Sequence, residues 1–177
     1  MQRSEHPLID EAALQQRVAE LAQEVRRAYP DALPLCLCVL KGSVFFAADF
    51  VRHLGPEVEL DFIRARSYLG LHSSGTVALT HTPEADLRGR HLLVLEDIVD
   101  TGRSARVILD WLDAQAPASV RLCTLLDKPS RRELDVTPDF VGFSIPDAFV
   151  VGYGLDHNER YRALRAIYIL EPPAKIS

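Results

Sequence analysis

Apolar residues recur along the chain at two spacings, one typical of amphipathic helices and one typical of buried strands. A helix is predicted from a capping residue at Asp10 to about position 28, because apolar side chains repeat at helical spacing at Leu14, Val18, Leu21 and Val25. Short and nearly continuous apolar runs at 35–40, 92–95 and 120–126 predict strands buried on both faces of a sheet.

Further elements fill the spaces between these runs. Apolar helices are predicted at 44–54 and 105–114, each directly after a strand and a glycine-containing turn. The alternating segment 59–66 predicts a strand with Leu60, Phe62 and Ile63 facing inward. Shorter strands are expected at 77–80 and near 166–170, and residues 140–156 are strand-rich but broken by Gly and Pro. Strands that alternate with helices predict an α/β fold with a central, mainly parallel sheet flanked by helices.

Size and composition narrow the class of protein. The chain of 177 residues suits a single domain, 1–177, and no linker or repeat divides it. Its net charge of −5 argues against nucleic acid or an anionic membrane as the main partner. No signal peptide or membrane span is expected, so the interpretation is a cytoplasmic protein. Cys36, Cys38 and Cys123 lie in apolar runs and are expected to be buried and reduced.

The stretch from Leu92 to Ala105 carries the most chemistry. Glu96 and Asp97 are expected at the open C-terminal edge of the sheet, because burying two carboxylates is costly. Small and hydroxylated residues then precede a helix and leave its first N–H groups open to an anion. Carboxylates beside a phosphate need a cation or sugar hydroxyls between them, so the pattern favours a sugar phosphate with Mg²⁺. The same residues also suit a plain strand end followed by a helix cap.

The residues 96–104, E-D-I-V-D-T-G-R-S, resemble the phosphoribosyl-pyrophosphate signature of type I phosphoribosyltransferases. Four further segments match the hypoxanthine-guanine (6-oxopurine) phosphoribosyltransferase family in the same order: L-K-G-S at 40–43, S-Y at 67–68, L-L-D-K-P-S-R-R at 125–132, and G-F-S-I-P-D-A-F-V-V-G-Y-G-L-D-H-N-E-R-Y-R at 142–162. The resemblance implies a type I phosphoribosyltransferase-like fold with a small hood subdomain formed by part of the N-terminus and about 140–177. Arg103 and Ser104 depart from the residues that the family often has there.

The resemblance also implies an activity and a set of site residues. The activity is purine salvage, in which a phosphoribosyl group moves from phosphoribosyl pyrophosphate to N9 of hypoxanthine or guanine and gives IMP or GMP. The residues implied for phosphoribosyl pyrophosphate are Lys41, Gly42, Glu96, Asp97, Asp100, Thr101, Gly102, Arg103, Ser104 and Arg162. Mg²⁺ is the implied cofactor, with Glu96, Asp97 and Asp156 as its ligands. Small-molecule substrates and a homodimer or homotetramer are the implied partners, with no nucleic acid and no membrane.

Within that set, Asp100 is expected to act as the general base at purine N7. Burial or an adjacent anion is expected to make its carboxylate basic enough for this role. Ser67 and Tyr68 are expected to begin a flexible lid that keeps water from a reactive glycosyl cation, although a simple hairpin tip also suits the composition of 67–76.

The purine is expected to be recognised by later residues. Lys128 donates hydrogen bonds and accepts none, so it suits the O6 of an oxopurine better than the amino group of adenine. The ring of Phe149 is expected to stack on the base, while the main chains of Val150 and Asp156 meet its edge. Without the surrounding motif, Phe149 and Val150 are more typical of an ordinary strand core.

Two other functions use a similar pattern. An RNA-binding regulator on the same fold would need a basic face, which the acidic balance disfavours. A receiver domain that uses its acidic pair for Mg²⁺ has no need of the segment 125–132 or of Phe149 and Val150. Within the oxopurines, the sequence does not rank hypoxanthine, guanine and xanthine.

Overall fold

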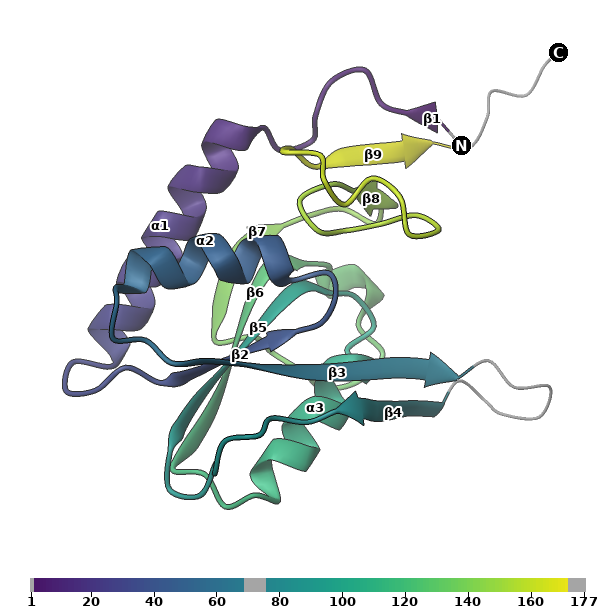
Figure 1. Cartoon of the computed structure of the whole chain (residues 1–177). Coiled ribbons are helices and arrows are strands. Elements are labelled where there is room, and N and C mark those ends of the chain that lie inside the picture. Colours follow the sequence, from purple (N-terminus) through teal and green to yellow (C-terminus); the bar gives the residue numbers. More distant parts are fainter. Residues whose placement is uncertain (1, 69–75, 172–177) are drawn as a thin grey trace, which may run out of the picture.

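The computed structural model describes residues 2–68 and 76–171 and contains two sheets (Figure 1). The main sheet has six strands in the order β4 (Thr76–His81), β3 (Leu60–Tyr68), β2 (Leu35–Val39), β5 (His91–Val99), β6 (Ser119–Asp127) and β7 (Phe140–Ser144). Five of these strands run parallel, and β4 pairs antiparallel with β3. The predicted α/β fold with a mainly parallel sheet is confirmed.

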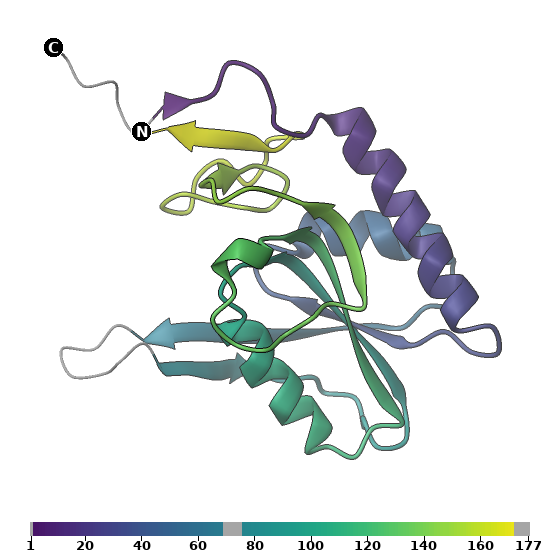
Figure 2. The same ribbon diagram turned by 180° about the vertical axis from the view of Figure 1, so that it is seen from behind.

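Helices cover both faces of the main sheet (Figures 1 and 2). Helices α1 (Glu11–Ala28) and α2 (Val44–Leu54) pack together on one face, where Phe46 and Phe50 are fully buried. Helix α3 (Arg103–Asp113) covers the other face through Ile108 and Leu112. As predicted, α1 begins at its cap Asp10, whose carboxylate accepts a hydrogen bond from the Ala13 N–H at 2.8 Å.

A second, three-stranded antiparallel sheet lies beside α2 and joins two distant parts of the chain (Figure 1). Its strand order is β1 (Gln2–Arg3), β9 (Tyr168–Glu171) and β8 (Val150–Val151). We call this sheet, together with the segment 152–167, the hood. Strand β7 pairs with β6 in the main sheet. Residues 140–144 therefore lie outside the hood, whereas the resemblance had implied a hood that begins at about position 140.

The inward face predicted for the third strand was wrong. Ile63 is fully buried against the α3 side, whereas Leu60 and Phe62 are 39% and 38% exposed. Neighbouring residues of a strand point to opposite faces, so the three side chains could not all face one core. Ser67 and Tyr68 are the last residues of β3 and pair with Val77 and Thr76. The rest of the expected lid, 69–75, lies outside the described residues.

Two expectations from composition can be compared with the structure. The three cysteines are buried and free of disulfides, as predicted. Among the described residues, no helix combines the length and the apolar character that a membrane span requires.

Candidate active site

Parallel strands bring the predicted site residues to one edge of the main sheet. Strands β2, β5 and β6 all end at this edge, and the segments that follow them begin at Leu40, Asp100 and Lys128. This carboxyl edge is where open α/β sheets bind ligands. Residues from three distant parts of the sequence therefore meet in space.

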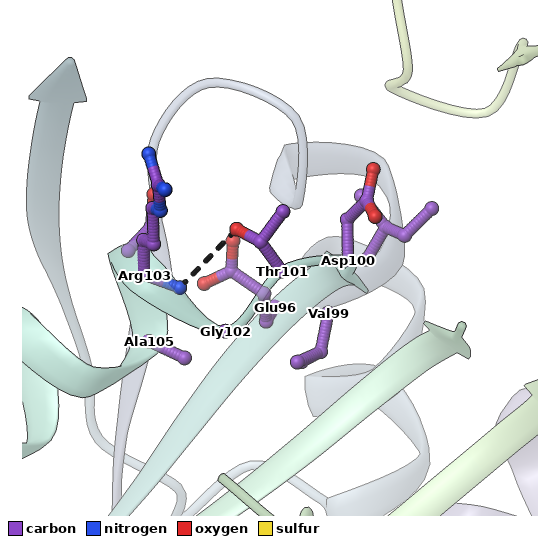
Figure 3. Close-up of a pocket in the computed structure, with 9 residues that line it drawn as sticks. Glu96, Val99, Asp100, Thr101, Gly102, Arg103 and Ala105 are labelled. Atoms are coloured by element: carbon purple, nitrogen blue, oxygen red, sulfur yellow. Dashed lines mark hydrogen bonds between the residues drawn. The ribbon is translucent and has the colours of Figure 1, made fainter. Parts of the chain in front are cut away.

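The start of α3 forms a pocket of about 230 Å³ at this edge (Figure 3). Gly102 precedes the helix in a left-handed conformation, with φ of 84°, and has no side chain with which to cap it. The Arg103 N–H donates a long hydrogen bond, 3.4 Å, to the Thr101 hydroxyl (Figure 3). The pocket is lined by Glu96 from β5 and by the run from Ile98 to Ala105. The N-terminus of the helix suits a phosphate, and the candidate phosphate-binding residues Thr101, Arg103 and Ser104 line this pocket.

Glu96 and Asp97 do not form a paired site, because β5 continues to Val99 and turns them to opposite faces. Glu96 lies toward the α3 pocket and is only 8% exposed. Its Oε2 atom is buried and finds no hydrogen-bond partner in the described part of the chain. The expectation that both carboxylates lie at an open edge was therefore wrong for Glu96, whose pKa is raised well above its ordinary value by burial and by Asp97.

Asp97 faces the other side of the sheet, toward α2 and the hood. Its carboxylate packs so closely on Gly42 that a side chain at position 42 would collide with it. Burial raises the pKa of Asp97 to about 6, and Asp156 adds to the increase. The N–H groups of Asp97 and Ile98, together with the charge of Arg162, act in the opposite direction.

Lys41, Asp156 and Arg162 lie together on this side. The Nη2 atom of Arg162 is 2.8 Å from the Asp156 carboxylate, and its Nη1 donates to the Gly154 carbonyl at 2.7 Å. Gly154 has a φ of +105° and lies directly on the Gly42 carbonyl, where a Cβ would not fit. The hood is thereby fastened to the turn after β2.

Asp100 lies between two cations. Its carboxylate is 41% exposed, and it is 3.9 Å from the Lys128 ammonium and 3.3 Å from the Arg131 Nε. In Figure 3 it stands apart from the Glu96 and Thr101 side chains. Asp100 was expected to be buried or to lie beside an anion, but it is part-exposed and lies beside cations.

The purine-binding candidates lie at different depths. Lys128 is only 5% exposed although it is charged, and its main-chain N–H donates to the Val99 carbonyl. Phe149 is 48% exposed and meets the His157 ring edge-on, with the ring centres 5.6 Å apart. Val150 is buried in β8, so its side chain belongs to the core, as the simpler interpretation held.

Comparison with known proteins decides the family. The family model described as "Phosphoribosyl transferase domain" matches residues 8–158. The hypoxanthine-guanine phosphoribosyltransferase of Bacillus subtilis is 43% identical over 169 residues, which cover 95% of this chain and 94% of the relative. This chain belongs to the hypoxanthine-guanine phosphoribosyltransferase family.

Other members of this family support the assignment. A hypoxanthine-guanine-xanthine phosphoribosyltransferase of Tritrichomonas foetus is 39% identical over 94% of this chain and 92% of its own length. A crystal structure of a Bacillus anthracis hypoxanthine-guanine phosphoribosyltransferase, with HEPES in its active site, superposes with a TM-score of 0.89 at 40% identity. That match covers 94% of this chain and 99% of the other. The predicted type I phosphoribosyltransferase fold is confirmed.

The three carboxylates predicted as magnesium ligands are not gathered into one group. Among the described residues, no three His, Cys, Asp or Glu side chains lie close enough to hold a metal ion. Glu96 and Asp97 point to opposite faces, and Asp156 is paired with Arg162. Mg²⁺ is usually bound by one or two protein carboxylates together with substrate phosphates, so the unpartnered Glu96 oxygen still fits an ion carried in by the substrate of a phosphoribosyltransferase.

Sequence reasoning missed two charged residues of the site. Arg131 contacts Asp100 and also lies 3.7 Å from Asp147, which links the segment after β6 to the segment before Phe149. Glu159 binds both Lys41 and Arg162. Both residues lie inside the segments that match the family, but neither has a spacing or a neighbour in the sequence that indicates its partners.

Proposed function

We propose that this chain transfers the 5-phosphoribosyl group of phosphoribosyl pyrophosphate to N9 of a 6-oxopurine, hypoxanthine or guanine, and releases pyrophosphate. The observation that carries the proposal is the buried Lys128, which lies 3.9 Å from Asp100, a residue that lines the α3 pocket. A cation that selects the base thus lies beside the loop suited to the sugar phosphate. Membership of the family supports the same substrates.

Binding of the ribose phosphate is assigned to the start of α3. The N–H groups and hydroxyls of residues 101–104 would hold the 5′-phosphate, because the N-terminus of a helix favours a dianion. Glu96 lines the same pocket, and its free oxygen suits a ribose hydroxyl. Asp97, on the other face of β5, lies toward the side assigned to pyrophosphate.

Departure of pyrophosphate leaves positive charge on the ribose ring and negative charge on the leaving group. Lys41, Arg162 and the main chain at Gly42 would stabilise that negative charge, which grows as the C1–O bond lengthens. Mg²⁺, held by Glu96 or Asp97 with the substrate oxygens, would supply further charge neutralisation when bound.

Recognition of the base is assigned to Lys128 and the hood. The Lys128 ammonium would donate to O6, Phe149 would cover the base, and the main chains of Val150 and Asp156 would meet its edge. Asp100 is assigned the proton at N7, and its contact with Lys128 would align it with the same base. Ser67 and Tyr68 remain candidates for the start of the lid.

The experiment is a spectrophotometric assay with phosphoribosyl pyrophosphate, Mg²⁺ and one base at a time: hypoxanthine, guanine, xanthine or adenine. We expect turnover with hypoxanthine or guanine and very little with adenine, which lacks the O6 acceptor. The names of the relatives differ on xanthine, so its rate measures how the purine 2-position is treated. Turnover with adenine alone would contradict the role of Lys128. Sedimentation velocity of the same sample tests the proposed homodimer or homotetramer.

A further inference from the structure

Both cations assigned to pyrophosphate are bound to a single carboxylate oxygen in this structure. The Oε2 atom of Glu159 lies 3.1 Å from the Lys41 Nζ and 3.2 Å from the Arg162 Nη2. Two positive groups this close together repel each other unless an anion lies between them. Glu159 provides that anion where the leaving group is expected to bind.

The turn that carries Glu159 has a defined conformation. Asn158, Glu159 and Tyr161 all have positive φ values, between 52° and 76°, which non-glycine residues adopt only when their surroundings fix them. The Glu159 N–H donates to the Asp156 carboxylate at 2.9 Å. The main chains of His157 and Arg160 bond to each other in both directions at 3.1 Å. The backbone position from which the Glu159 side chain extends is therefore fixed.

The ion pairs themselves are weak enough to exchange. The side chains of Glu159 and Lys41 are 63% and 47% exposed, and ion pairs in contact with water contribute little. Their hydrogen bonds nevertheless hold Glu159 ionised, because Lys41 and then Arg162 lower the pKa of its carboxyl group. A pyrophosphate group with several negative charges would displace one carboxylate from both cations.

Arg162 and Lys41 differ in the contacts that remain once Glu159 has been displaced. Arg162 keeps its bonds to Gly154 and Asp156 when Glu159 leaves, so its place is maintained. For Lys41, the bond to Glu159 is the one ion pair that the described residues provide. Glu159 therefore positions Lys41 in particular before the substrate arrives.

We propose that Glu159 is a stand-in anion, which holds Lys41 and Arg162 until the pyrophosphate group of the substrate or product displaces it. The inference rests on the proposed function, because it assumes that these two cations bind pyrophosphate. Glu159 is thus a positioning residue. It holds the two cations in place for pyrophosphate and also competes with pyrophosphate for them.

The test is calorimetric titration of Mg²⁺-pyrophosphate into the full-length protein and into Glu159→Gln. Removing the competing charge is expected to tighten binding about three- to tenfold, the range for two exposed ion pairs. The matched control is Glu57→Gln, which makes the same change of charge at an exposed residue at the opposite edge of the sheet, between α2 and β3. It is expected to bind like the wild type.

Further measurements separate the possible outcomes. In a Lys41→Ala background, the gain from Glu159→Gln should shrink, because one of the two released cations is absent. Unchanged or weaker binding by Glu159→Gln, with a thermal unfolding curve like that of the wild type, would overturn the inference. If Glu159→Gln does not fold, Glu159→Asp replaces it, and its shorter reach should also tighten binding; binding no tighter than the wild type would overturn the inference. Wild-type turnover with hypoxanthine in the same preparation tests the proposed function separately.

Discussion

Lys128 is a charged side chain in a nearly closed environment, which is costly unless the charge has a partner. Asp100 lies 3.9 Å from it, at the outer limit of an ion pair, so the ammonium keeps capacity to donate elsewhere. A lysine held in this way is suited to the carbonyl of a bound base.

Replacing Lys128 with alanine should therefore weaken base recognition. We expect kcat/KM for hypoxanthine to fall by the equivalent of about 1.5–3 kcal/mol, the range for a hydrogen bond to a charged group. The KM for phosphoribosyl pyrophosphate should change little. Lys128→Met keeps most of the side-chain volume, and it should show the same loss if the charge is responsible.

Asp100 is expected to be the proton acceptor of the reaction. Asp100→Asn should lower kcat about 10²–10⁴-fold, because one acid–base group usually contributes that much. The control is Asp113→Asn, an exposed aspartate at the far end of α3. Steady-state kinetics at saturating substrates measure both variants, and an unchanged kcat in Asp100→Asn would remove Asp100 from this role.

Asp97 should make stability depend on pH. Its pKa rises from 3.8 to about 6 on folding, so the folded protein holds a proton that the unfolded chain releases. The stabilising contribution of Asp97 to the free energy of unfolding is therefore fully present below pH 4, and it is lost as the pH rises through 6. Asp97→Asn should be more stable than the wild type by about 1–2 kcal/mol at pH 8, after allowance for solvent screening.

Urea denaturation of the wild type and Asp97→Asn across pH 4–8 tests this expectation. The difference in unfolding free energy between the two proteins should be small at pH 4 and grow up to about pH 7. A difference that does not vary with pH would mean that Asp97 titrates normally.

At the scale of elements, the join between the hood and the turn after β2 is a contact of two glycines. The space at Gly154 is closed by the Gly42 carbonyl, and its φ of +105° disfavours other residues. Gly154→Ala should cost about 1–3 kcal/mol of stability and raise the KM for phosphoribosyl pyrophosphate, because Lys41 and Arg162 would move apart.

Gly89 offers the matched control for that substitution. It also has a positive φ, +68°, but among the described atoms nothing lies within 4 Å of a Cβ placed there. Gly89→Ala should show the conformational cost without the change in KM. If the two variants have the same KM for phosphoribosyl pyrophosphate, the contact between Gly154 and Gly42 does not affect substrate binding and the prediction is wrong.

Periodicity predicted the elements well where packing follows local pattern. Helix α2 begins and ends at the predicted residues, and α3 begins two residues earlier than expected. Strands β1 and β8 have two residues each, which is too short for any periodicity to indicate. Their pairing depends on β9, which lies far away in the sequence.

The sequence predicted which residues belong to the site better than it predicted which face of the sheet each side chain points to. The motif gave Glu96 and Asp97 as neighbours, but whether they share a face depends on where β5 ends. Leu60 and Phe62 were misplaced for a similar reason, because the sequence does not state which face of β3 is covered. Glu159 binds Lys41 across 118 positions, and no local pattern encodes that contact.

For the whole molecule, net charge and substrate charge have the same sign. The chain carries a charge of −5, and phosphoribosyl pyrophosphate is strongly anionic, so binding requires cations at the site. Chelating Mg²⁺ with excess EDTA should abolish turnover, and adding Mg²⁺ back should restore it. Full activity in excess chelator would rule out the metal requirement.

The pairing of β1 with β9 brings residues 2–3 against residues 168–171. A growing chain on the ribosome can complete all six strands of the main sheet once residue 144 has emerged, but it cannot close the smaller sheet until the last of these residues is made. The phosphate pocket can therefore form before the smaller sheet closes. The hood strand that begins at Val150 gains its partner only after residues 168–171 have emerged, so base recognition should be acquired after the phosphate pocket.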